Sequence, residues 1–455
     1  MKARIPILSA LLAVGVSPLH AATIAVTSTS DSGPGSLRGA LANAGNGDTI
    51  DATGIAGTIV LTSGQLVVSN SVSIIGPGPR TLVVNGNLPN TTNRVFLVSS
   101  NLTVTITSLT ITNGFAFSSS NEIPDNFGGG IHNDHSTLTV SNCTLSGNSG
   151  GGIYNDGENY GSAILTVVNS TLSGNSGGGG IGNEGANYGS ATLTVSNSTL
   201  SGNSANSGGG IYNLGHYGRA QSMVASTTFS GNSGGGIVNY AFTYSDTATV
   251  AIVNTILNAG ASGASITNIS GIVTSLGYNL SSDTAGGDDH STGPGGLLNA
   301  TGDIRNTDPM LGPLTDNGGP TFTHALLPCS PAIDQGASLG LVTDQRGYPR
   351  TYDDPSILNA GGGNGTDIGA FEVQLHQSCA FAVTAFRRIG TGKDLRLSYT
   401  TVLGSNYVVQ TRSNMGSGSW TRLPGNNPGI GVVMQSIVTN GFAAPQGFYR
   451  VQQSP

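Results

Sequence analysis

The stretch STLSGNSGGGG, Ser170–Gly180, returns with small changes along the chain. Related copies are CTLSGNSGGG at Cys143–Gly152, STLSGNSANSGGG at Ser198–Gly210 and TTFSGNSGGG at Thr227–Gly236. Consecutive copies lie 27 to 29 residues apart when they are aligned on their large residues, which are Leu145, Leu172, Leu200, Phe229 and Ile256. A fixed period of this length indicates a stacked repeat structure rather than a single globular core.

Each copy contains short runs that alternate apolar and polar residues, and alternation predicts half-buried strands. Gly, Ser and Asn separate these runs, as turns require. The pattern predicts three short strands per copy, for example TLTV, STLSGN and GGGIYN. Such strands bury their apolar faces if each pairs with its equivalent in the next copy, about 4.8 Å away. We therefore expect an all-β protein built on a right-handed parallel β-helix. A β-sandwich or a disordered Gly/Ser tract would not need the repeats to stay in register.

Asparagine recurs at two fixed positions of the repeat, and stacked amides can bond along the axis of the coils. The first set follows the repeated phrase, and the second follows the isoleucine after the glycines. The two predicted ladders are Asn148, Asn175, Asn203 and Asn232, and Asn133, Asn155, Asn183, Asn213 and Asn239. Cys143 takes the place of Ser170 and Ser198, so we expect it to be a small inward residue.

The bulk composition excludes some classes of partner. The net charge is -7 and only 9% of the residues are charged, so no basic groove for nucleic acid or anionic lipid is expected. The first 21 residues have a positive start followed by an apolar stretch, as secretory signals do. No later apolar run is long enough to span a membrane. We therefore expect a secreted, extracellular or cell-surface protein.

The composition changes along the chain and suggests several parts. GSLRGALANAG, Gly35–Gly45, predicts a short helix with Ser36 as its N-cap, which would close the first coil. The predicted order is a signal peptide (1–21), an N-terminal cap with the first coils (22–127), Gly-rich coils (128–278), a capping segment (279–373), a linker (374–384) and a small β-sandwich-like domain (385–455).

Several motifs in the capping segment occur in a recognisable order. They are NTDPMLGPLTDNGGPTFTHALLPCSPAIDQG at Asn306–Gly336, TDQRGYPR at Thr343–Arg350 and DIGAFE at Asp367–Glu372. This part resembles the choice-of-anchor Q domain of secreted bacterial proteins. The Gly-rich repeats resemble right-handed β-helix proteins related to polymorphic outer-membrane proteins and adhesins. The resemblance implies a pectate-lyase-like solenoid that is displayed at a cell surface.

Three acidic residues share one position of the repeat. Asp134, Asp156 and Glu184 each stand three residues after the repeat isoleucine, so they should stack in a row on adjacent coils. They are either solvated turn residues or a site that binds Ca²⁺ or shares a proton. Ca²⁺ at this row is the one cofactor that the sequence suggests, and it assigns no catalytic residue.

Tyrosine recurs 12 residues before four of the aligned large residues, and the set is Tyr160, Tyr188, Tyr217 and Tyr244. Four tyrosines in one register would stack along one edge of the coil. If they point outward, they form a platform for sugar rings. If they point inward, they form an aromatic ladder that closes a turn.

The remaining candidates are cysteines, histidines and two polar motifs. Cys329 and Cys379 could form a disulfide in an oxidising compartment. The three histidines of the repeats, His132, His135 and His216, lack metal-ligand spacing, and we expect them at the surface. DQRG at Asp344 and SPAID at Ser330 are interpreted as structural ion pairs and turn hydrogen bonds.

These observations favour a non-catalytic role in adhesion or glycan contact, with a polysaccharide or another surface protein as partner. A polysaccharide-active enzyme is the first alternative. A lyase needs a cation or a basic side chain, and Arg219 is the one Lys or Arg between Val95 and Ile304. A hydrolase needs only two carboxylates about 5 to 9.5 Å apart. A structural surface spacer is the second alternative.

Overall fold

The structure is a computed structural model that describes most of the chain. The described residues are 21–116, 127–243, 246–375, 383–389, 394–401, 406–412, 419–423, 427–428, 433–438 and 448–454. The predicted signal peptide, apart from Ala21, lies outside them.

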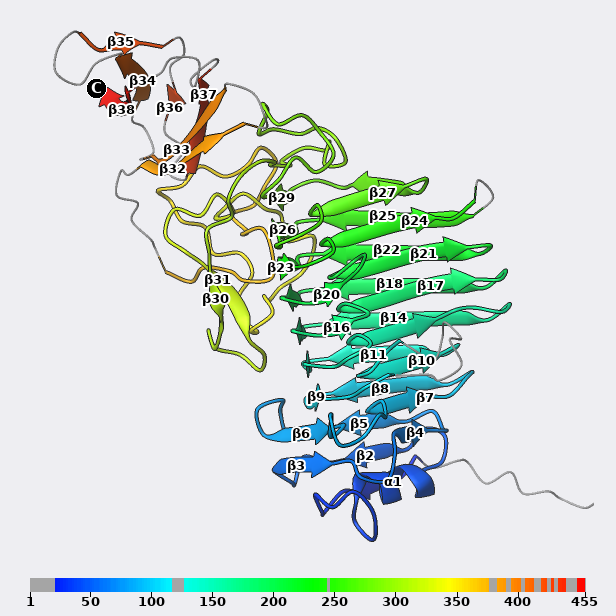
Figure 1. Cartoon of the computed structure of the whole chain (residues 1–455). Coiled ribbons are helices and arrows are strands. Elements are labelled where there is room, and N and C mark those ends of the chain that lie inside the picture. Colours follow the sequence, from blue (N-terminus) through cyan, green and yellow to red (C-terminus); the bar gives the residue numbers. More distant parts are fainter. Residues whose placement is uncertain are drawn as a thin grey trace, which may run out of the picture.

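The chain forms a right-handed parallel β-helix, as predicted (Figure 1). Each coil contributes one strand to each of three parallel sheets, which we call sheets A, B and C. Sheet A contains β1 (Thr23–Ala25), β2 (Thr49–Asp51), β5 (Ser73–Ile75), β8 (Thr103–Thr107), β11 (Thr137–Ser141), β14 (Ser162–Val168), β18 (Ser190–Ser196), β22 (Arg219–Ala225), β25 (Thr247–Val253) and β28 (Ile272–Ser275). Sheet B contains β3 (Gly57–Val60), β6 (Leu82–Asn85), β9 (Thr110–Thr112), β12 (Thr144–Ser146), β15 (Thr171–Ser173), β19 (Thr199–Ser201), β23 (Thr228–Asn232), β26 (Ile256–Ala259) and β29 (Leu280–Ser281). Sheet C contains β4 (Leu66–Val68), β7 (Phe96–Val98), β10 (Ile131–Asp134), β13 (Ile153–Asp156), β17 (Ile181–Ala186), β21 (Ile211–His216), β24 (Ile237–Ala241) and β27 (Ile266–Ile269). Two short strands, β16 (Ser176–Gly177) and β20 (Ser204–Ala205), pair beside the coils.

The repeated phrase builds the interior of the coils. Leu145, Leu172, Leu200 and Phe229 are paired in register along sheet B, and all are fully buried. Both asparagine ladders are present: Asn148 donates to Asn175 and Asn175 to Asn203, each over 2.9 Å. The ladder that follows the isoleucine runs on from Asn239 to Asn268. Cys143 is a free, buried thiol, as its place in the repeat predicts.

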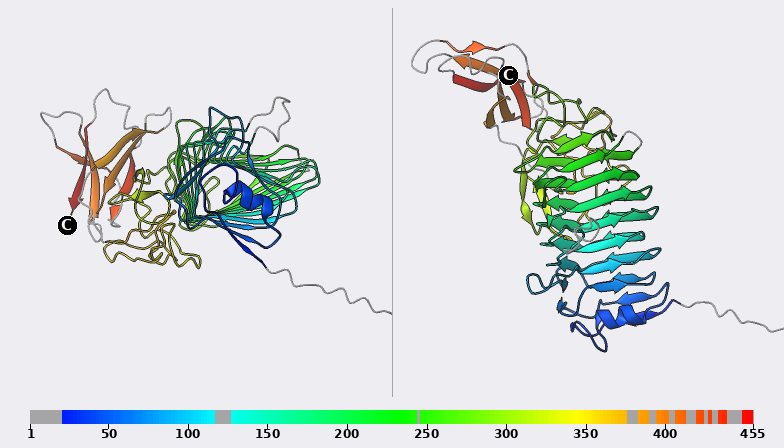
Figure 2. Two further views of the ribbon diagram at one scale, coloured as in Figure 1. Left: turned by 90° about the horizontal axis from the view of Figure 1, so that it is seen from below. Right: turned by 45° about the vertical axis from the view of Figure 1, so that its right-hand side comes forward.

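The first coil is closed by the predicted helix, α1 (Leu37–Asn43), which lies across the end of the solenoid (Figure 2). Ser36 is its N-cap, and the Ser36 hydroxyl accepts a hydrogen bond from the Gly39 N–H over 3.0 Å. Leu37 and Leu41 are buried against the first coils. The helix therefore shields the apolar interior from water at this end.

The predicted capping segment, residues 279–373, covers the far end of the solenoid and also part of its side. At the far end, Ala285 and Leu298 join the apolar core of the coils. Residues 306–373, which we call the side segment, then run back along the outer face of sheet B (Figure 1). The side segment contains the antiparallel pair β30 (Leu311–Thr315) and β31 (Thr323–Leu326).

Side-chain hydrogen bonds hold the side segment to three successive strands of sheet B. The Thr171 hydroxyl donates to the Phe322 carbonyl over 2.6 Å, and the Thr199 hydroxyl donates to Gln345 Oε1 over 2.7 Å. The Ala370 N–H donates to the Thr228 hydroxyl over 3.0 Å. The outer face of sheet B is therefore covered along these coils.

Both motifs that we interpreted as structural have that role in the side segment. Asp344 pairs with Arg346 at 2.6 Å and accepts the backbone N–H of Tyr348. Ser330 donates to the Pro309 carbonyl over 2.6 Å.

The C-terminal part forms small antiparallel sheets around a separate core of Leu395, Leu397, Tyr399 and Tyr407. One sheet contains β32 (Val383–Arg388), β33 (Leu395–Thr400) and β37 (Val433–Val438). The other contains β34 (Asn406–Arg412), β35 (Thr421–Arg422), β36 (Asn427–Pro428) and β38 (Phe448–Ser454). Arg396 donates to the Asn306 carbonyl over 2.8 Å, which ties this part to the end of the solenoid.

Candidate functional site

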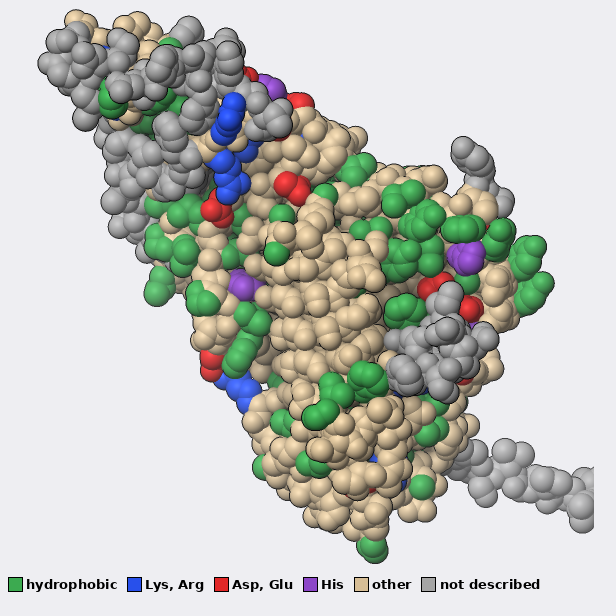
Figure 3. All heavy atoms as spheres, viewed as in Figure 1, with side chains coloured by type: hydrophobic (Ala, Val, Ile, Leu, Met, Phe, Trp, Pro, Cys, Tyr) green, Lys and Arg blue, Asp and Glu red, His purple; other side chains and the backbone are tan. Residues whose placement is uncertain are grey.

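The outer face of sheet C carries most of the unusual side chains of the coils. Hydrophobic, histidine and acidic side chains gather there over β17, β21 and β24, while most of the other coil surface that faces the viewer is uncharged (Figure 3). Alternation along the strands points two residues of each strand outward, so two outward rows run along the sheet. The first row is His132, Tyr154, Gly182, Tyr212 and Val238, and the second is Asp134, Asp156, Glu184, Leu214 and Tyr240.

The second row places the three predicted carboxylates on adjacent coils, in register. Asp134 is half-buried, whereas Asp156 and Glu184 are only 5% and 6% exposed. The alternative that these are solvated turn residues is therefore wrong for Asp156 and Glu184. Neighbouring side chains and the turn after each strand cover them.

The prediction that the histidines lie at the surface is wrong for His132, which is 6% exposed. Its Nε2 lies 3.1 Å from Asp156 Oδ2, so the buried carboxylate holds the imidazole in place. His135 is half-buried, pairs with Asp134 through Nδ1 and places Nε2 2.7 Å from the Glu158 carbonyl oxygen. The contacts of His132 with Asp156 and of His135 with Glu158 could not be seen in the sequence, because each joins different register positions of adjacent coils.

Two further residues complete the cluster, and neither was singled out in the sequence. Tyr154 Oη lies 2.8 Å from Glu158 Oε1 and 3.0 Å from Glu184 Oε2. A phenol has one proton to donate. The phenol therefore either shares its proton between both carboxylates or accepts a proton from one of them, and the raised pKa of both acids favours the second arrangement.

The carboxyl groups have opposite pKa shifts. Burial opposes ionisation of Asp156, but hydrogen bonds from His132 and from the Glu158 N–H lower its pKa overall. Burial, together with the charges of Glu158 and Asp156, raises the pKa of Glu184 to about 8. Burial also raises the pKa of Glu158. Asp156 is therefore the anion of the cluster, and Glu184 is neutral at pH 7.

This protonation pattern predicts a pH-dependent stability. Since the pKa of Glu184 is raised in the fold, its contribution is complete below about pH 4.5 and is lost as the pH rises towards 8. The Glu184→Gln variant carries a permanent neutral isostere. Its free energy of unfolding should match that of the wild type at pH 5 and exceed it at pH 9. The difference should grow by about 1.4 kcal/mol per pH unit at most. Urea unfolding at both pH values measures this difference, and a constant difference would show that Glu184 ionises normally.

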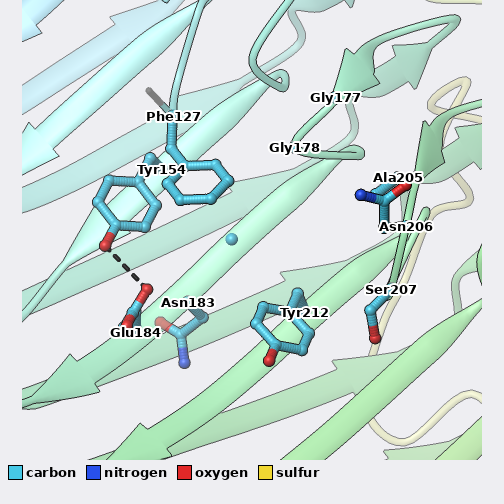
Figure 4. Close-up of a pocket in the computed structure, with 11 residues that line it drawn as sticks. Phe127, Tyr154, Gly177, Gly178, Asn183, Glu184, Ala205, Asn206, Ser207 and Tyr212 are labelled. Atoms are coloured by element: carbon cyan, nitrogen blue, oxygen red, sulfur yellow. Dashed lines mark hydrogen bonds between the residues drawn. The ribbon is translucent and has the colours of Figure 1, made fainter. Parts of the chain in front are cut away.

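A cavity of about 220 Å³ opens on the first row, at Gly182 (Figure 4). Because Gly182 lacks a side chain, a gap remains between Tyr154 on one neighbouring coil and Tyr212 on the other. Phe127 packs against Tyr154, with ring centroids 5.3 Å apart. The rest of the lining is Gly177, Gly178, Asn183, Glu184, Ala205, Asn206 and Ser207. The cavity therefore has aromatic walls, a few polar groups and one carboxyl group.

Three of the predicted tyrosines form an outward row, which we call the tyrosine row: Tyr160, Tyr188 and Tyr217. They are 79%, 73% and 48% exposed. The rings of Tyr160 and Tyr188 stack with centroids 5.3 Å apart and an interplanar angle of 16°. The inward ladder is therefore not what the structure shows. Tyr244, the fourth member of the predicted set, lies outside the described residues.

The backbone of the tyrosine row favours other residue types. The three tyrosines have φ angles of 64°, 66° and 53°, in the left-handed region that Gly and Asn adopt most easily. Neither burial nor backbone preference explains tyrosine at these positions. A surface hollow of about 320 Å³ lies at Tyr188 and Tyr217 and is also lined by Arg219 and Asp246.

The cysteine and metal predictions are only partly covered by the described residues. Cys329 is disulfide-bonded, whereas Cys379 lies outside the described residues, so their pairing stays a prediction. Asp134, His135 and Asp156 each offer one ligand atom, and these atoms lie within 4.8 Å of one another. Both carboxylates already have histidine partners, and Glu184 is not part of this group, so we assign no metal here. Binding of Ca²⁺ to the acidic row stays a prediction.

No protein-family model matches the sequence, and no curated protein matches it. The fold and the side chains of sheet C are therefore the basis for any functional proposal. Within the described residues, no helix combines the length and the apolar character needed to cross a membrane.

Proposed function

We propose that this protein is a non-catalytic β-helix protein of the cell surface or the extracellular medium that contacts glycans through the tyrosine row. The hollow at Tyr188 and Tyr217 carries the proposal. It combines two exposed aromatic rings with the guanidinium of Arg219 and the carboxylate of Asp246. Aromatic faces can pack on the C–H groups of a sugar ring, while charged side chains bond its hydroxyl groups.

The repeat supports an extended contact rather than a single pocket. Equivalent tyrosines stand on adjacent coils about 4.8 Å apart, so a polysaccharide chain that follows the axis of the solenoid meets several rings. The motifs of the side segment, with their resemblance to choice-of-anchor Q domains, support display at the surface of a bacterial cell.

The Tyr188→Ala variant tests the glycan contact. Binding to the best ligand in a panel of plant, algal and bacterial polysaccharides should weaken about tenfold, which corresponds to roughly 1.4 kcal/mol. Because the Tyr188 side chain is 73% exposed, the midpoint of thermal unfolding should hardly change. Co-sedimentation measures the binding. The Tyr348→Ala variant removes an exposed tyrosine of the side segment and should bind as the wild type does. Equal binding by Tyr188→Ala and the wild type would exclude the tyrosine row as the site.

A polysaccharide hydrolase is the second candidate. The observation that favours it is the adjacent pair Asp156 and Glu184, one with a lowered and one with a raised pKa, which is how many enzymes assign base and acid. New reducing ends in the co-sedimentation tubes, absent with Glu184→Gln, would support this candidate. Binding without products supports the non-catalytic role.

A further inference from the structure

The Gly182 cavity is a separate site from the tyrosine row. Tyr154 and Tyr212 stand two coil spacings apart, about 9.6 Å between their backbones, with Gly182 between them. The gap has room for one small ring or headgroup, and not for a chain of sugars. A side chain at position 182 would fill it, since a Cβ there would already meet the Tyr154 ring at 3.0 Å.

The lining of this cavity is aromatic and acidic. Phe127, Tyr154 and Tyr212 are its large residues, and Glu184 is its one titratable carboxyl group. None of the lining residues that the structure describes is Lys, Arg or His. Arg94 is close by and donates from Nε to the Phe127 carbonyl over 3.1 Å, but it does not line the cavity.

One of the two carboxyl groups that contact Tyr154 holds a proton that it can release when a cation binds. Tyr154 has one proton for both Glu158 and Glu184, and burial raises the pKa of both acids, so we infer that one of them holds a proton. A cation in the cavity would favour the ionised form of both Glu158 and Glu184, because an opposite charge within about 4 to 6 Å stabilises a carboxylate.

We propose that the Gly182 cavity binds an organic ammonium group, which packs against the rings of Phe127, Tyr154 and Tyr212 and pairs with the Glu184 carboxylate. Aromatic faces attract such cations, and most strongly where the cation is desolvated. Anionic ligands are disfavoured by the neighbouring Asp156 and Glu158. The ammonium can come from an amino sugar or from a choline-type headgroup, since both fit a cavity of about 220 Å³.

Isothermal titration of the purified chain tests the proposal and separates the two sources. Choline and glucosamine are the probes, and glucose and N-acetylglucosamine are the uncharged controls for glucosamine. Binding of choline alone identifies a quaternary ammonium site, and binding of glucosamine alone identifies an amino-sugar site. Both outcomes support an ammonium site. Equal affinity for glucosamine and N-acetylglucosamine, or no heat with either cation at millimolar concentration, would overturn it.

The pH dependence gives a second readout. Groups that face Glu184 are Tyr154, Asp156 and Glu158 from one neighbouring coil and Tyr212 from the other. Burial raises the pKa of Tyr212 to about 12 and raises the pKa of Tyr154 well above its ordinary value, so neither ionises near neutrality. Because the cation needs ionised Glu184, choline affinity should rise with pH up to about 8, by at most about tenfold per unit. His132 lies against Asp156, and His135 lies against the Glu158 carbonyl.

Variants separate the Gly182 cavity from the tyrosine row. Glu184→Gln should weaken choline binding at least tenfold at pH 8 and remove most of the pH dependence, while Gly182→Leu should abolish binding by filling the cavity. Asp246→Asn, in the hollow at Tyr188 and Tyr217, should bind choline normally. Tyr188→Ala should also bind choline normally even where its glycan binding is lost. Thermal unfolding confirms that each variant is folded. Unchanged choline binding by folded Gly182→Leu would contradict the proposal.

Discussion

The Arg350→Met variant should lower the free energy of unfolding of the side segment by about 3 to 6 kcal/mol, because two buried acceptors lose hydrogen bonds from a charged donor that are worth about 1.5 to 3 kcal/mol each. Arg350 is fully buried and donates from one nitrogen to Asn197 Oδ1 and to the Gly369 carbonyl, both over 2.7 Å. Its other terminal nitrogen lies 3.7 Å from the Glu372 carboxylate. Methionine fills the space but leaves Asn197 Oδ1 and the Gly369 carbonyl without their donor. Limited proteolysis should therefore cut the side segment in the variant well before the coils.

The chain offers a matched control in Arg80. Arg80 also joins the coils to the side segment, donating to Asp316 Oδ1 over 2.7 Å and to the Gly319 carbonyl over 2.8 Å. The ion pair is exposed, at 43% for Arg80 and 49% for Asp316, so Arg80→Met should change stability by about 1 kcal/mol or less. Equal proteolysis of the two variants would mean that the buried arginine does not hold the side segment.

The Asn175→Leu variant should lower the free energy of unfolding of the coils by about 2 to 5 kcal/mol. Asn175 Oδ1 accepts the backbone N–H of Asn148, and Asn175 Nδ2 donates to the Leu145 carbonyl over 3.0 Å. Leucine has a similar volume and satisfies neither group. Each buried group left without a partner costs about 1 to 3 kcal/mol. The midpoint of urea unfolding, followed by circular dichroism, measures the loss.

Asn187→Gly is the control for the ladder. Asn187 donates to Asn159 Oδ1 over 3.0 Å, but this amide contact is exposed. Glycine keeps the positive φ of 48° that position 187 requires. A change of less than about 1 kcal/mol is expected, because water can replace the lost partner. A loss as large as that of Asn175→Leu would show that burial of the amides does not determine how much the ladders stabilise the fold.

Repetition explains what the sequence could predict. The strands, both asparagine ladders, inward Cys143 and the acidic and tyrosine rows all depend on equivalent positions in successive copies. The N-cap and the apolar face of α1 were predicted directly from its own sequence. The sequence could not decide whether the tyrosine side chains point inward or outward, because both arrangements keep them in register.

The site residues that were missed occur once or break the repeat. Glu158 stands where the next coil has Ala186, so no register marked it. The row of Tyr154, Gly182 and Tyr212 was visible one position after the repeat isoleucine, and a glycine between two tyrosines was the available signal for a cavity. The path of the side segment depends on contacts between residues far apart in the sequence, such as Gln345 with Thr171, which no local pattern encodes.

The side segment also sets an order of assembly. Each coil pairs with the one before it across 22 to 35 residues, so the solenoid can grow one coil at a time. The bond between Gln345 and Thr171 spans 174 residues, and its partners on sheet B exist only when several coils are complete. The side segment therefore docks late, after these coils of the solenoid have formed. A chain with a defective coil would leave this segment loose and open to proteolysis, which provides a built-in check on the length and register of the repeat.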